Sequence, residues 1–223
     1  QFDHPIVLID GRTYIPLRET AETLGMDVQW NNVKKEISIS QIDKSGSDLI
    51  VFTKDRCQGY MDKDYNIVIE AKYHTAEPFR EGLACVQADT GFGFINAEGE
   101  VVIPCIYPNA YRFINGAALV DLSLSTDVGK MTYIDKQGNR ITDKVFDSAK
   151  FFSKEGYAAV LVEGYLWNEV HGGGENNRWS YLDKTGEFAT DLEFQKADSF
   201  YYGFAAVKNN GKWGLINTEF QLV

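Results

Sequence analysis

From about residue 56 onward, apolar and polar residues alternate over short stretches, and one phrase returns several times. The phrase is a small residue, an aromatic residue or leucine, an apolar residue, and then Asp or Asn. Its five copies begin the segments 59–63, 93–97, 132–136, 180–184 and 214–218. Alternation predicts short strands, and recurrence in a fixed order is typical of repeat proteins.

A second phrase follows each of the first four copies. It is an aromatic residue, Ala three positions later, Phe three or so positions after that, and then Gly-x-Ala-x-Val. Its Ala and Val pairs are Ala84 and Val86, Ala118 and Val120, Ala158 and Val160, and Ala205 and Val207. From the first aromatic residue to this Val the chain advances 26, 26, 27 and 26 residues, whereas the link to the next copy advances 8, 13, 21 and 8. One loop therefore absorbs almost all variation in length.

Each copy predicts three short strands. The first strand carries the aromatic residue, and a turn such as Asp135–Gly138 leads to the second strand, which is clearest at 101–103. The Ala-x-x-Phe segment crosses over, and Gly restarts the third strand. We expect the repeated Asp and Asn side chains to accept backbone N–H groups in the turns, and Gly to supply a positive φ. We expect the aromatic residues to form an interior that adjacent copies share.

The first forty residues follow a different pattern. Apolar residues at 6–9 and 13–15 flank Asp10-Gly11, which predicts a hairpin. Pro16, Leu17 and Leu24 then suit a helix that Gly25 ends, and 28–30 and 36–40 predict a second hairpin. The predicted fold class is therefore mainly β: a small α+β unit followed by tandem three-stranded β-meander repeats. Periodicity leaves open whether the repeats form an open solenoid or a closed, propeller-like ring.

The predicted boundaries follow from these patterns. The N-terminal unit covers 1–40, a polar junction covers 41–55, and the repeats cover 56–223. The predicted repeats are 56–90, 91–128, 129–177, 178–210 and a partial copy at 211–223. The last copy is half a unit long, so we expect either that the intact protein continues or that the chain was cut.

The two phrases together resemble the WG-repeat family, in which Trp-Gly opens the first phrase. Lys212-Trp213-Gly214 is the closest match. The Trp position holds Gln58, Phe92 and Met131 in the first three copies and Trp179 in the fourth. The resemblance covers roughly 56–223 and implies β-rich repeat modules, often on secreted or surface proteins, that share no catalytic site.

The N-terminal segment resembles the copper amine oxidase N-terminal-like domain. The residues that carry the resemblance are 10–18, Glu22, Leu24-Gly25 and 28–30. The resemblance implies a stalk module of a bacterial exported protein, with a spacer role. It implies no copper here, because copper sites need clustered imidazoles and the chain has only His4, His74 and His171, far apart in sequence.

Composition narrows the classes of partner. The chain of 223 residues has 22 Lys and Arg against 32 Asp and Glu, for a net charge of −10. This balance argues against nucleic acid or anionic lipid, since phosphate binding needs a basic face. No apolar run approaches the ~20 residues that span a membrane. Cys57, Cys85 and Cys105 are expected to be free thiols, with one disulfide as the alternative.

A ligand site is predicted at the longest insertion, 163–178. Tyr165 and Trp167, with Trp179 just after them, can stack on sugar rings or anchor a protein contact. The alternative is an extended hairpin without a site. The segment starting at Asp62 mimics the start of a calcium loop, but Ile67 stands where such a loop needs Gly, so a turn is expected instead.

The chain lacks the common enzyme motifs, which predicts no enzymatic activity, cofactor or metal; a hydrolase with two acidic side chains far apart in sequence stays open. The predicted function is a non-enzymatic, secreted or cell-surface binding or scaffold module, whose ligand is a cell-wall polysaccharide or a protein. The alternatives are an accessory module of a larger cell-wall-active enzyme and a purely structural spacer. The oligomeric state is not predicted.

Overall fold

The computed structural model describes residues 48–123, 130–163 and 177–223, together with four strands of the N-terminal segment. The chain divides into two compact units, Gln1–Lys44 and Ser45–Val223. All regular elements among the described residues are strands. This arrangement confirms a mainly β fold class with tandem meander repeats.

The N-terminal unit contains two antiparallel hairpins. Strand β1 (Val7–Ile9) pairs with β2 (Arg12–Tyr14). Strand β3 (Met26–Asn31) pairs with β4 (Glu36–Gln41). Both hairpins were expected from the sequence. The helix predicted between them lies outside the described residues.

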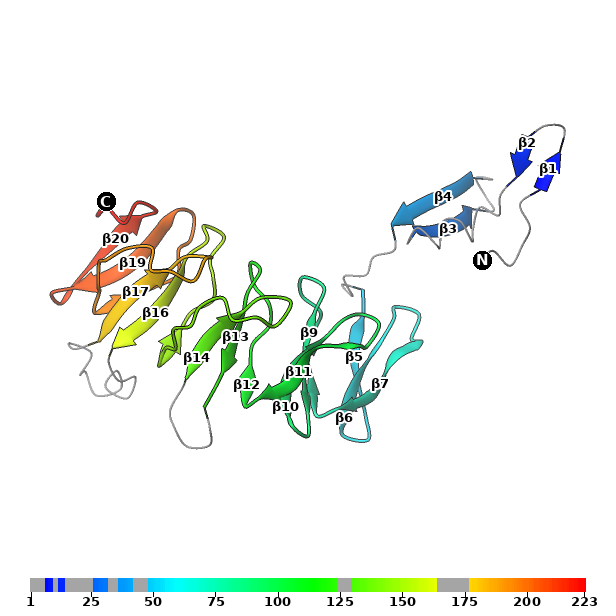
Figure 1. Ribbon diagram of the computed structural model, residues 1–223, viewed down its shortest axis with the longest axis horizontal. Helices are drawn as coiled ribbons and strands as arrows, with labels where there is room; N and C mark the ends of the chain where they lie inside the picture. Colours follow the sequence, from blue (N-terminus) through cyan, green and yellow to red (C-terminus); the bar gives the residue numbers. More distant parts are fainter. Residues whose placement is uncertain are drawn as a thin grey trace. The chain divides into compact units, whose positions relative to one another are not determined.

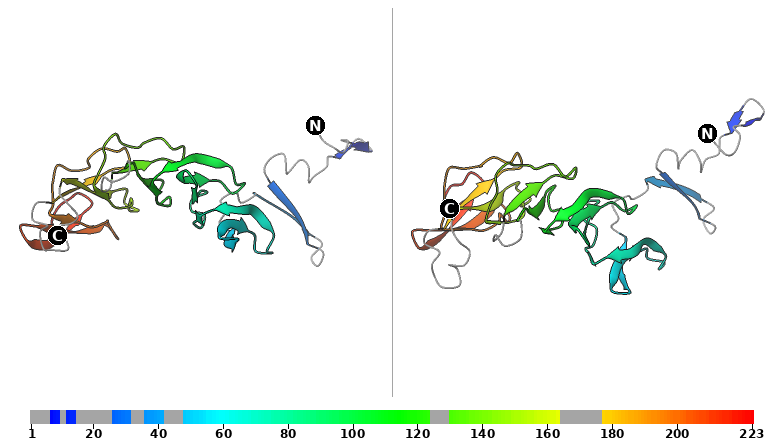
Figure 2. Two further views of the ribbon diagram at one scale, coloured as in Figure 1. Left: turned by 90° about the horizontal axis from the view of Figure 1, so that it is seen from below. Right: turned by 60° about the horizontal axis from the view of Figure 1, so that its bottom comes forward.

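The described strands of the second unit form a row of five antiparallel sheets, called sheets 1 to 5 below. Sheet 1 contains β5 (Ile50–Lys54), β6 (Cys57–Met61) and β7 (Ile67–Tyr73), and sheet 2 contains β8 (Thr75–Ala76), β9 (Ala84–Ala88), β10 (Gly91–Ile95) and β11 (Val101–Tyr107). Sheet 3 contains β12 (Asn109–Ala110), β13 (Ala118–Asp121) and β14 (Met131–Ile134), and sheet 4 contains β15 (Ser148–Ala149), β16 (Ala158–Glu163) and β17 (Arg178–Leu182). Sheet 5 contains β18 (Lys196–Ala197), β19 (Phe204–Asn209) and β20 (Lys212–Asn217). Sheets 1 and 5 lie at opposite ends of the row (Figures 1 and 2), so the array is open rather than closed into a ring. Strand β5 lies inside the segment predicted as a junction and pairs with β6 in sheet 1.

Each of sheets 2 to 5 is built from two successive sequence copies. The third strand of one copy pairs with the first strand of the next, as Val120 does with Thr132 and Val160 with Ser180. The Ala of the second phrase pairs with the third strand of its own copy, as Ala110 does with Val120. A sequence copy therefore runs from one sheet to the next, and this crossing joins the sheets covalently at every step.

Among the described residues, the hydrophobic core has four clusters, each lying between two successive sheets. Alternate residues of one third strand enter different clusters: Ala118 and Val120 enter the cluster shared with sheet 2, and Ala117 and Leu119 enter the cluster shared with sheet 4. This follows from the two-residue period of a strand. The third-strand alanines occupy equivalent places in the four clusters and are at most 1% exposed: Ala84, Ala118, Ala158 and Ala205. The predicted shared interior is confirmed.

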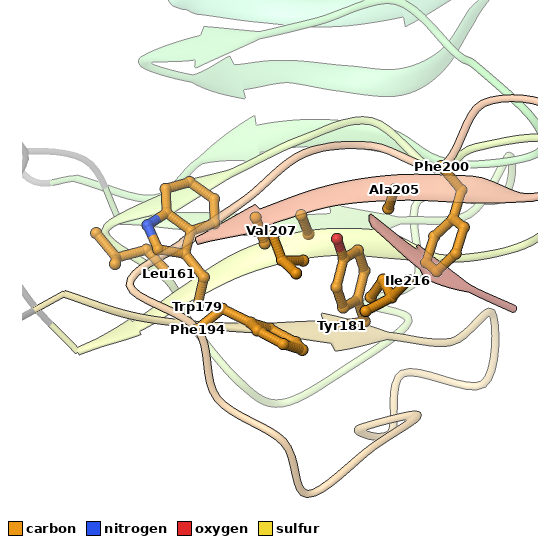
Figure 3. Close-up of a cluster of buried hydrophobic side chains, with 10 residues drawn as sticks. Leu161, Trp179, Tyr181, Phe194, Phe200, Ala205, Val207 and Ile216 are labelled. Carbon is orange, nitrogen blue, oxygen red and sulfur yellow. The ribbon is translucent and has the colours of Figure 1, made fainter. Parts of the chain in front are cut away.

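Figure 3 shows the cluster between sheets 4 and 5. Tyr181, from the first phrase, lies beside Ile216 of the next copy, and Trp179 lies beside Leu161. The ring centroids of Tyr181 and Phe200 are 5.0 Å apart. The Tyr181 hydroxyl donates a hydrogen bond of 2.8 Å to the carbonyl of Asp198, so the phenol is satisfied although it is buried.

The second strands differ between copies, which the sequence pattern did not predict. Copies 1 and 2 have the full strands β7 and β11, whereas copies 3 and 4 keep only isolated bridges, such as Ile134 to Arg140 and Leu182 to Phe188. The residue before the first aromatic explains the difference. A Cβ added at Gly93 would lie 2.6 Å from the carbonyl oxygen of Ile103, so only glycine lets the second strand pair closely.

Copies 3 and 4 carry a hydroxyl at that same position. Thr132 Oγ1 donates to the carbonyl of Lys144 at 3.0 Å, and Ser180 Oγ donates to that of Leu192 at 3.1 Å. Both side chains are buried. The hydroxyl at this position therefore gives a backbone carbonyl of the same copy a hydrogen-bonding partner.

The turns carry the expected chemistry. The five turn residues Asp62, Asn96, Asp135, Asp183 and Asn217 each accept one or two backbone N–H groups within the next four residues. Gly138 and Gly186 close two of these turns with φ of 83° and 86°. The prediction that these acidic residues are turn residues is confirmed.

The single extra residue of the third copy lies in the turn before the third strand. The other three copies turn here through two residues of positive φ, for example Asn115 and Gly116, which is the type I′ geometry of a two-residue hairpin. In copy 3 the N–H of Ser153 bonds to the carbonyl of Tyr157, so the loop is one residue longer. The distance from the first aromatic residue to the third-strand Val is therefore 27 residues in copy 3 and 26 in the other three copies.

The three cysteines are free thiols, as expected. Cys85 is buried, and burial raises the pKa of its thiol to about 12. A thiol with so high a pKa is a poor nucleophile near neutral pH. Cys85 therefore serves as a core residue.

Candidate functional site

A groove of about 530 Å³ lies over sheets 3 and 4, and we call it the repeat groove. It is lined by Tyr111, Leu119, Asp121, Met131, Asp147, Ser148, Ala149, Lys150, Phe151 and Ser199. These residues come from three successive copies. A ligand in the groove would therefore contact several repeats at once, as is usual for solenoid binding surfaces.

Backbone pairing places the lining residues. Tyr111 follows Ala110 of β12, and Lys150 and Phe151 follow Ala149 of β15, so both groups leave their sheets at the same point of the repeat. The floor is formed by Leu119 and Met131 from β13 and β14, which are buried. The groove thus has an apolar base made by the core of the array.

Two aromatic rings form one wall of the groove. The centroids of Tyr111 and Phe151 are 6.0 Å apart with an interplanar angle of 77°, an edge-to-face arrangement. Tyr111 is 39% exposed, and its hydroxyl oxygen accepts a hydrogen bond of 3.3 Å from Asn109 Nδ2. The exposed part of this pair offers a flat apolar surface to a ligand.

The carboxylate of Asp121, at the rim of the groove, is held by hydrogen bonds from nearby residues. Asp121 Oδ1 accepts hydrogen bonds from the N–H of Ser123 at 2.8 Å and from its hydroxyl at 2.5 Å. Burial acts to raise the pKa of Asp121, but these hydrogen bonds and that from the Lys130 N–H outweigh it and lower the pKa, so the carboxylate is charged at neutral pH.

The remaining rim charges form ion pairs. Lys130 Nζ lies 3.2 Å from Asp147 Oδ1, and Lys150 is paired with Asp198. The Lys150 ammonium also lies 5.7 Å from the ring centroid of Trp179. Since these polar groups already have partners, the groove offers a ligand mainly apolar surface.

The structure places Trp179 in the hydrophobic core. Its side chain is 4% exposed and packs in the cluster between sheets 4 and 5 (Figure 3). An indole this buried has no face to present to a sugar ring unless β17 moves, so Trp179 is a core residue rather than a stacking platform. Tyr165 and Trp167 lie outside the described residues, and their predicted role stays a prediction.

Sequence reasoning missed Tyr111 and Phe151. For Tyr111 a usable signal was present, because the position after the second-phrase Ala varies strongly: Glu77, Tyr111, Lys150 and Asp198. A position that varies while its neighbours repeat faces away from the shared core. Variation of this kind on one face of a repeat array marks a surface free to bind.

The comparisons with known proteins agree with the repeat architecture. The family described as WG containing repeat matches at 59–89, 92–122, 131–167 and 179–213, which is more than half of the chain. The chain belongs to the WG-repeat family. Each matched segment of this WG-repeat protein runs from a first strand to a third strand, so the family unit is the sequence copy that crosses between two sheets.

The N-terminal segment matches a second family, the copper amine oxidase N-terminal domain, at residues 1–56. The matched segment contains one histidine, His4, and so offers no imidazole cluster for copper. His74 lies beyond it and is hydrogen-bonded to Asp89 at 2.7 Å. Among the described residues, no group of three or more His, Cys, Asp or Glu side chains is placed to hold a metal ion. We therefore derive no copper chemistry from this match.

No curated protein matches the chain. One solved structure, described as the crystal structure of the eukaryotic initiation factor, is similar over 81% of this chain and 63% of that chain, with 11% sequence identity and a TM-score of 0.39. The chain thus spans less than two thirds of that structure's length. A likeness this weak supports no argument about fold or function.

The matched families are a repeat family and an accessory domain, and neither is a catalytic domain. The WG-repeat protein is therefore a repeat or accessory module. In the part of the chain that the structure describes, no helix has the length and apolar character to cross a membrane.

Proposed function

We propose that this WG-repeat protein is a non-enzymatic binding module whose repeat groove holds an apolar segment of a partner protein. The observation that carries the proposal is the combination of an apolar floor at Leu119 and Met131 with a rim of paired charges. An apolar centre inside a polar rim is the usual composition of a protein–protein contact, where a buried anchor supplies most of the affinity.

The groove favours a protein over a cell-wall polysaccharide. A sugar presents many hydroxyl groups, and each needs a hydrogen-bonding partner when water is removed. The carboxylates of Asp121 and Asp147 and the ammonium of Lys150 already have partners within the protein. A large apolar or aromatic side chain needs fewer hydrogen-bonding partners, and it can pack against the wall that Tyr111 and Phe151 form.

The proposal places the protein outside the cell, secreted or attached to the surface. It is supported by the N-terminal match to a stalk-like domain and by the acidic composition, which suits a soluble spacer. Fractionation of cells that express the natural protein tests the location. Recovery from the cell-surface or culture fraction is expected, and recovery from the cytoplasm alone would contradict it.

The binding test compares two probes on the full chain. A library of random displayed peptides is selected on the wild-type protein, and insoluble cell-wall polysaccharide is used in a co-sedimentation assay. We expect selected peptides to carry large apolar residues and to lose at least tenfold in affinity for the Tyr111→Ala/Phe151→Ala variant. The matched control is Tyr65→Ala, which removes an aromatic ring that is 81% exposed and far along the chain from the groove.

The outcomes separate the candidate functions. Sedimentation with polysaccharide that depends on Tyr111 and Phe151 would overturn the choice of a protein ligand. If the Tyr165→Ala/Trp167→Ala variant loses binding while the Tyr111→Ala/Phe151→Ala variant keeps it, the site lies in the insertion 163–178 rather than in the repeat groove. Release of soluble fragments from the polysaccharide would indicate an enzyme, and binding of neither probe would leave the spacer function.

A further inference from the structure

Met131, on the floor of the repeat groove, stands at the position where the WG-repeat family has the Trp of its first phrase. Copy 4 keeps that Trp as Trp179. The two backbone positions are equivalent: the N–H of Met131 donates to the carbonyl of Phe146 at 2.8 Å, and the N–H of Trp179 donates to that of Phe194 at 2.8 Å. The interfaces between sheets 3 and 4 and between sheets 4 and 5 therefore differ here in the side chain alone.

The Trp179 indole fills its interface. It is 4% exposed and packs in the cluster with Leu161 (Figure 3), and the ammonium of Lys150 lies 5.7 Å from its ring centroid. The repeat groove of about 530 Å³ lies one interface earlier, at the residues that correspond to these. Methionine is unbranched and narrower than an indole. The groove therefore takes the place that the Trp ring fills in the next interface.

The groove gives an inserted ring an aromatic neighbour. Tyr111 directly follows Ala110, as Lys150 directly follows Ala149, so the two side chains leave their sheets at the same point. Where the Trp179 ring has the ammonium of Lys150 beside it, a ring in the groove has the partly exposed ring of Tyr111. Aromatic rings pack favourably edge to face or offset, so an aromatic anchor suits this wall.

The groove also has a carboxylate where the next interface has an alkyl group. Asp121 lies opposite Met131 in sheet 3, as Leu161 lies opposite Trp179 in sheet 4. Residues directly opposite in a sheet share a face. A ring held on Met131 therefore has Asp121 as its cross-strand neighbour, whereas the ring of Trp179 has Leu161.

The carboxylate of Asp121 retains an acceptor for a ligand. Among the described residues, the hydrogen bonds that Asp121 accepts come from Ser123 and from the N–H of Lys130, and all end on Oδ1. Oδ2 is thus left to accept. The buried indole N–H of Trp179, by contrast, has no hydrogen-bonding partner. The groove can satisfy an indole that the corresponding internal position leaves unsatisfied.

We propose that the anchor of the bound partner segment is a tryptophan side chain, whose indole packs on Met131 beside Tyr111 and donates its N–H to Asp121. The inference rests on the proposed binding of a protein segment in the repeat groove and adds the chemistry of the anchor. The partner supplies from another chain the ring that Trp179 supplies within this one. An aromatic ring that carries one polar N–H suits an apolar groove with one available acceptor.

The first test fills the groove from inside the full chain. Met131→Trp restores the family residue, whose ring should fill the groove as Trp179 fills the next interface. We expect circular dichroism to show a folded protein, and the peptides selected on the wild type to bind it at least tenfold more weakly. The matched control is Met131→Leu, a swap of similar volume that leaves the groove open and should bind like the wild type.

The second test changes the ligand and does not depend on the folding of Met131→Trp. In each selected peptide, the anchor Trp is replaced by 3-benzothienylalanine, in which sulfur takes the place of the ring N–H. We expect an affinity loss of about tenfold on the wild type, because a hydrogen bond to a charged acceptor is removed. Asp121→Asn keeps Oδ1 for Ser123 and puts an amide nitrogen in place of Oδ2, so on this variant the two peptides should bind equally.

The outcomes separate the inference from the proposed function. Peptides that need Tyr111 and Phe151 but carry Leu, Ile or Phe in place of an anchoring Trp would overturn the inference and leave the protein-binding groove standing. Absence of any groove-dependent peptide would overturn both. Undiminished binding by a folded Met131→Trp protein, or the same loss on sulfur replacement for the wild type and Asp121→Asn, would also contradict the inference.

Discussion

At the scale of single residues, the repeated acidic side chains are structural. Asp62, Asp135 and Asp183 accept backbone N–H groups in equivalent turns, and copies 2 and 5 use Asn96 and Asn217 for the same purpose. Asn offers the same acceptor oxygen without a charge. The sequence predicted this role correctly, because turn chemistry is local and depends on few residues.

The turn carboxylates make the free energy of unfolding depend on pH in the acid range. The hydrogen bonds from Asn66 lower the pKa of Asp62; burial acts to raise the pKa values of Asp135 and Asp183, but hydrogen bonds outweigh it and lower them. Because the pKa of each carboxyl is lower in the folded than in the unfolded chain, these carboxylates stabilise the fold at pH values above their ordinary pKa of about 3.8. That stabilisation is lost as the pH falls through the folded pKa. We expect the D62N/D135N/D183N variant to be less stable to urea than the wild type at pH 7, because it lacks this contribution, and to lose less stability below pH 4. An unchanged acid dependence would contradict this.

One turn residue carries backbone strain that can be removed. Tyr65 has φ of 65° and is 81% exposed, at the position where copies 2 to 4 have Gly99, Gly138 and Gly186. A left-handed conformation costs a non-glycine residue roughly 1–2 kcal/mol, part of which glycine returns through its larger unfolded entropy. Tyr65→Gly should therefore raise the free energy of unfolding by ~0.5–1 kcal/mol, and the reciprocal Gly138→Ala should lower it. Urea unfolding of both variants measures the two changes in the free energy of unfolding.

At the scale of elements, the residue before the first aromatic residue distinguishes copies 1 and 2, which have a second strand, from copies 3 and 4, which do not. Gly59 and Gly93 allow close pairing, whereas Thr132 and Ser180 replace it with a hydroxyl bond. The sequence predicted three strands in every copy, and this prediction was wrong for the second strand of copies 3 and 4. The alternation of apolar residues reports which face a residue takes, but not how closely two backbones approach.

Serine at Gly93 should disrupt copy 2. Its Cβ would lie 2.6 Å from the Ile103 carbonyl oxygen and 2.7 Å from the Cys105 backbone, so β11 must shift. Overpacking of this kind costs roughly 1–3 kcal/mol in the free energy of unfolding. Gly214→Ser is the matched control, because its Cβ would meet only the tip of Leu222 at 3.0 Å and a flexible side chain can move. Equal losses for the two variants would contradict the explanation.

At the scale of the whole molecule, the sequence predicted the shared interior but neither the phase of the sheets nor the groove. The regular spacing of Ala84, Ala118, Ala158 and Ala205 was enough to predict equivalent core positions. The phase of the sheets, that is, which strands share one sheet, depends on which strand the first strand of each copy pairs with. Both candidate partner strands are apolar, so the sequence pattern does not choose between them. The groove depends on Tyr111 and Phe151, which belong to different copies and have no common motif.

The central claim is that each core cluster lies between two successive sheets and is shared by successive copies, and a deletion in phase with the repeat tests it most directly. Removing 94–132 joins Gly93 to Tyr133, which occupies the position of Phe94, so three complete clusters remain. Removing the equally long segment 77–115 joins positions that are not equivalent. Thermal unfolding followed by circular dichroism should show a cooperative transition for the first deletion and none for the second. Loss of cooperative unfolding in both would contradict the account.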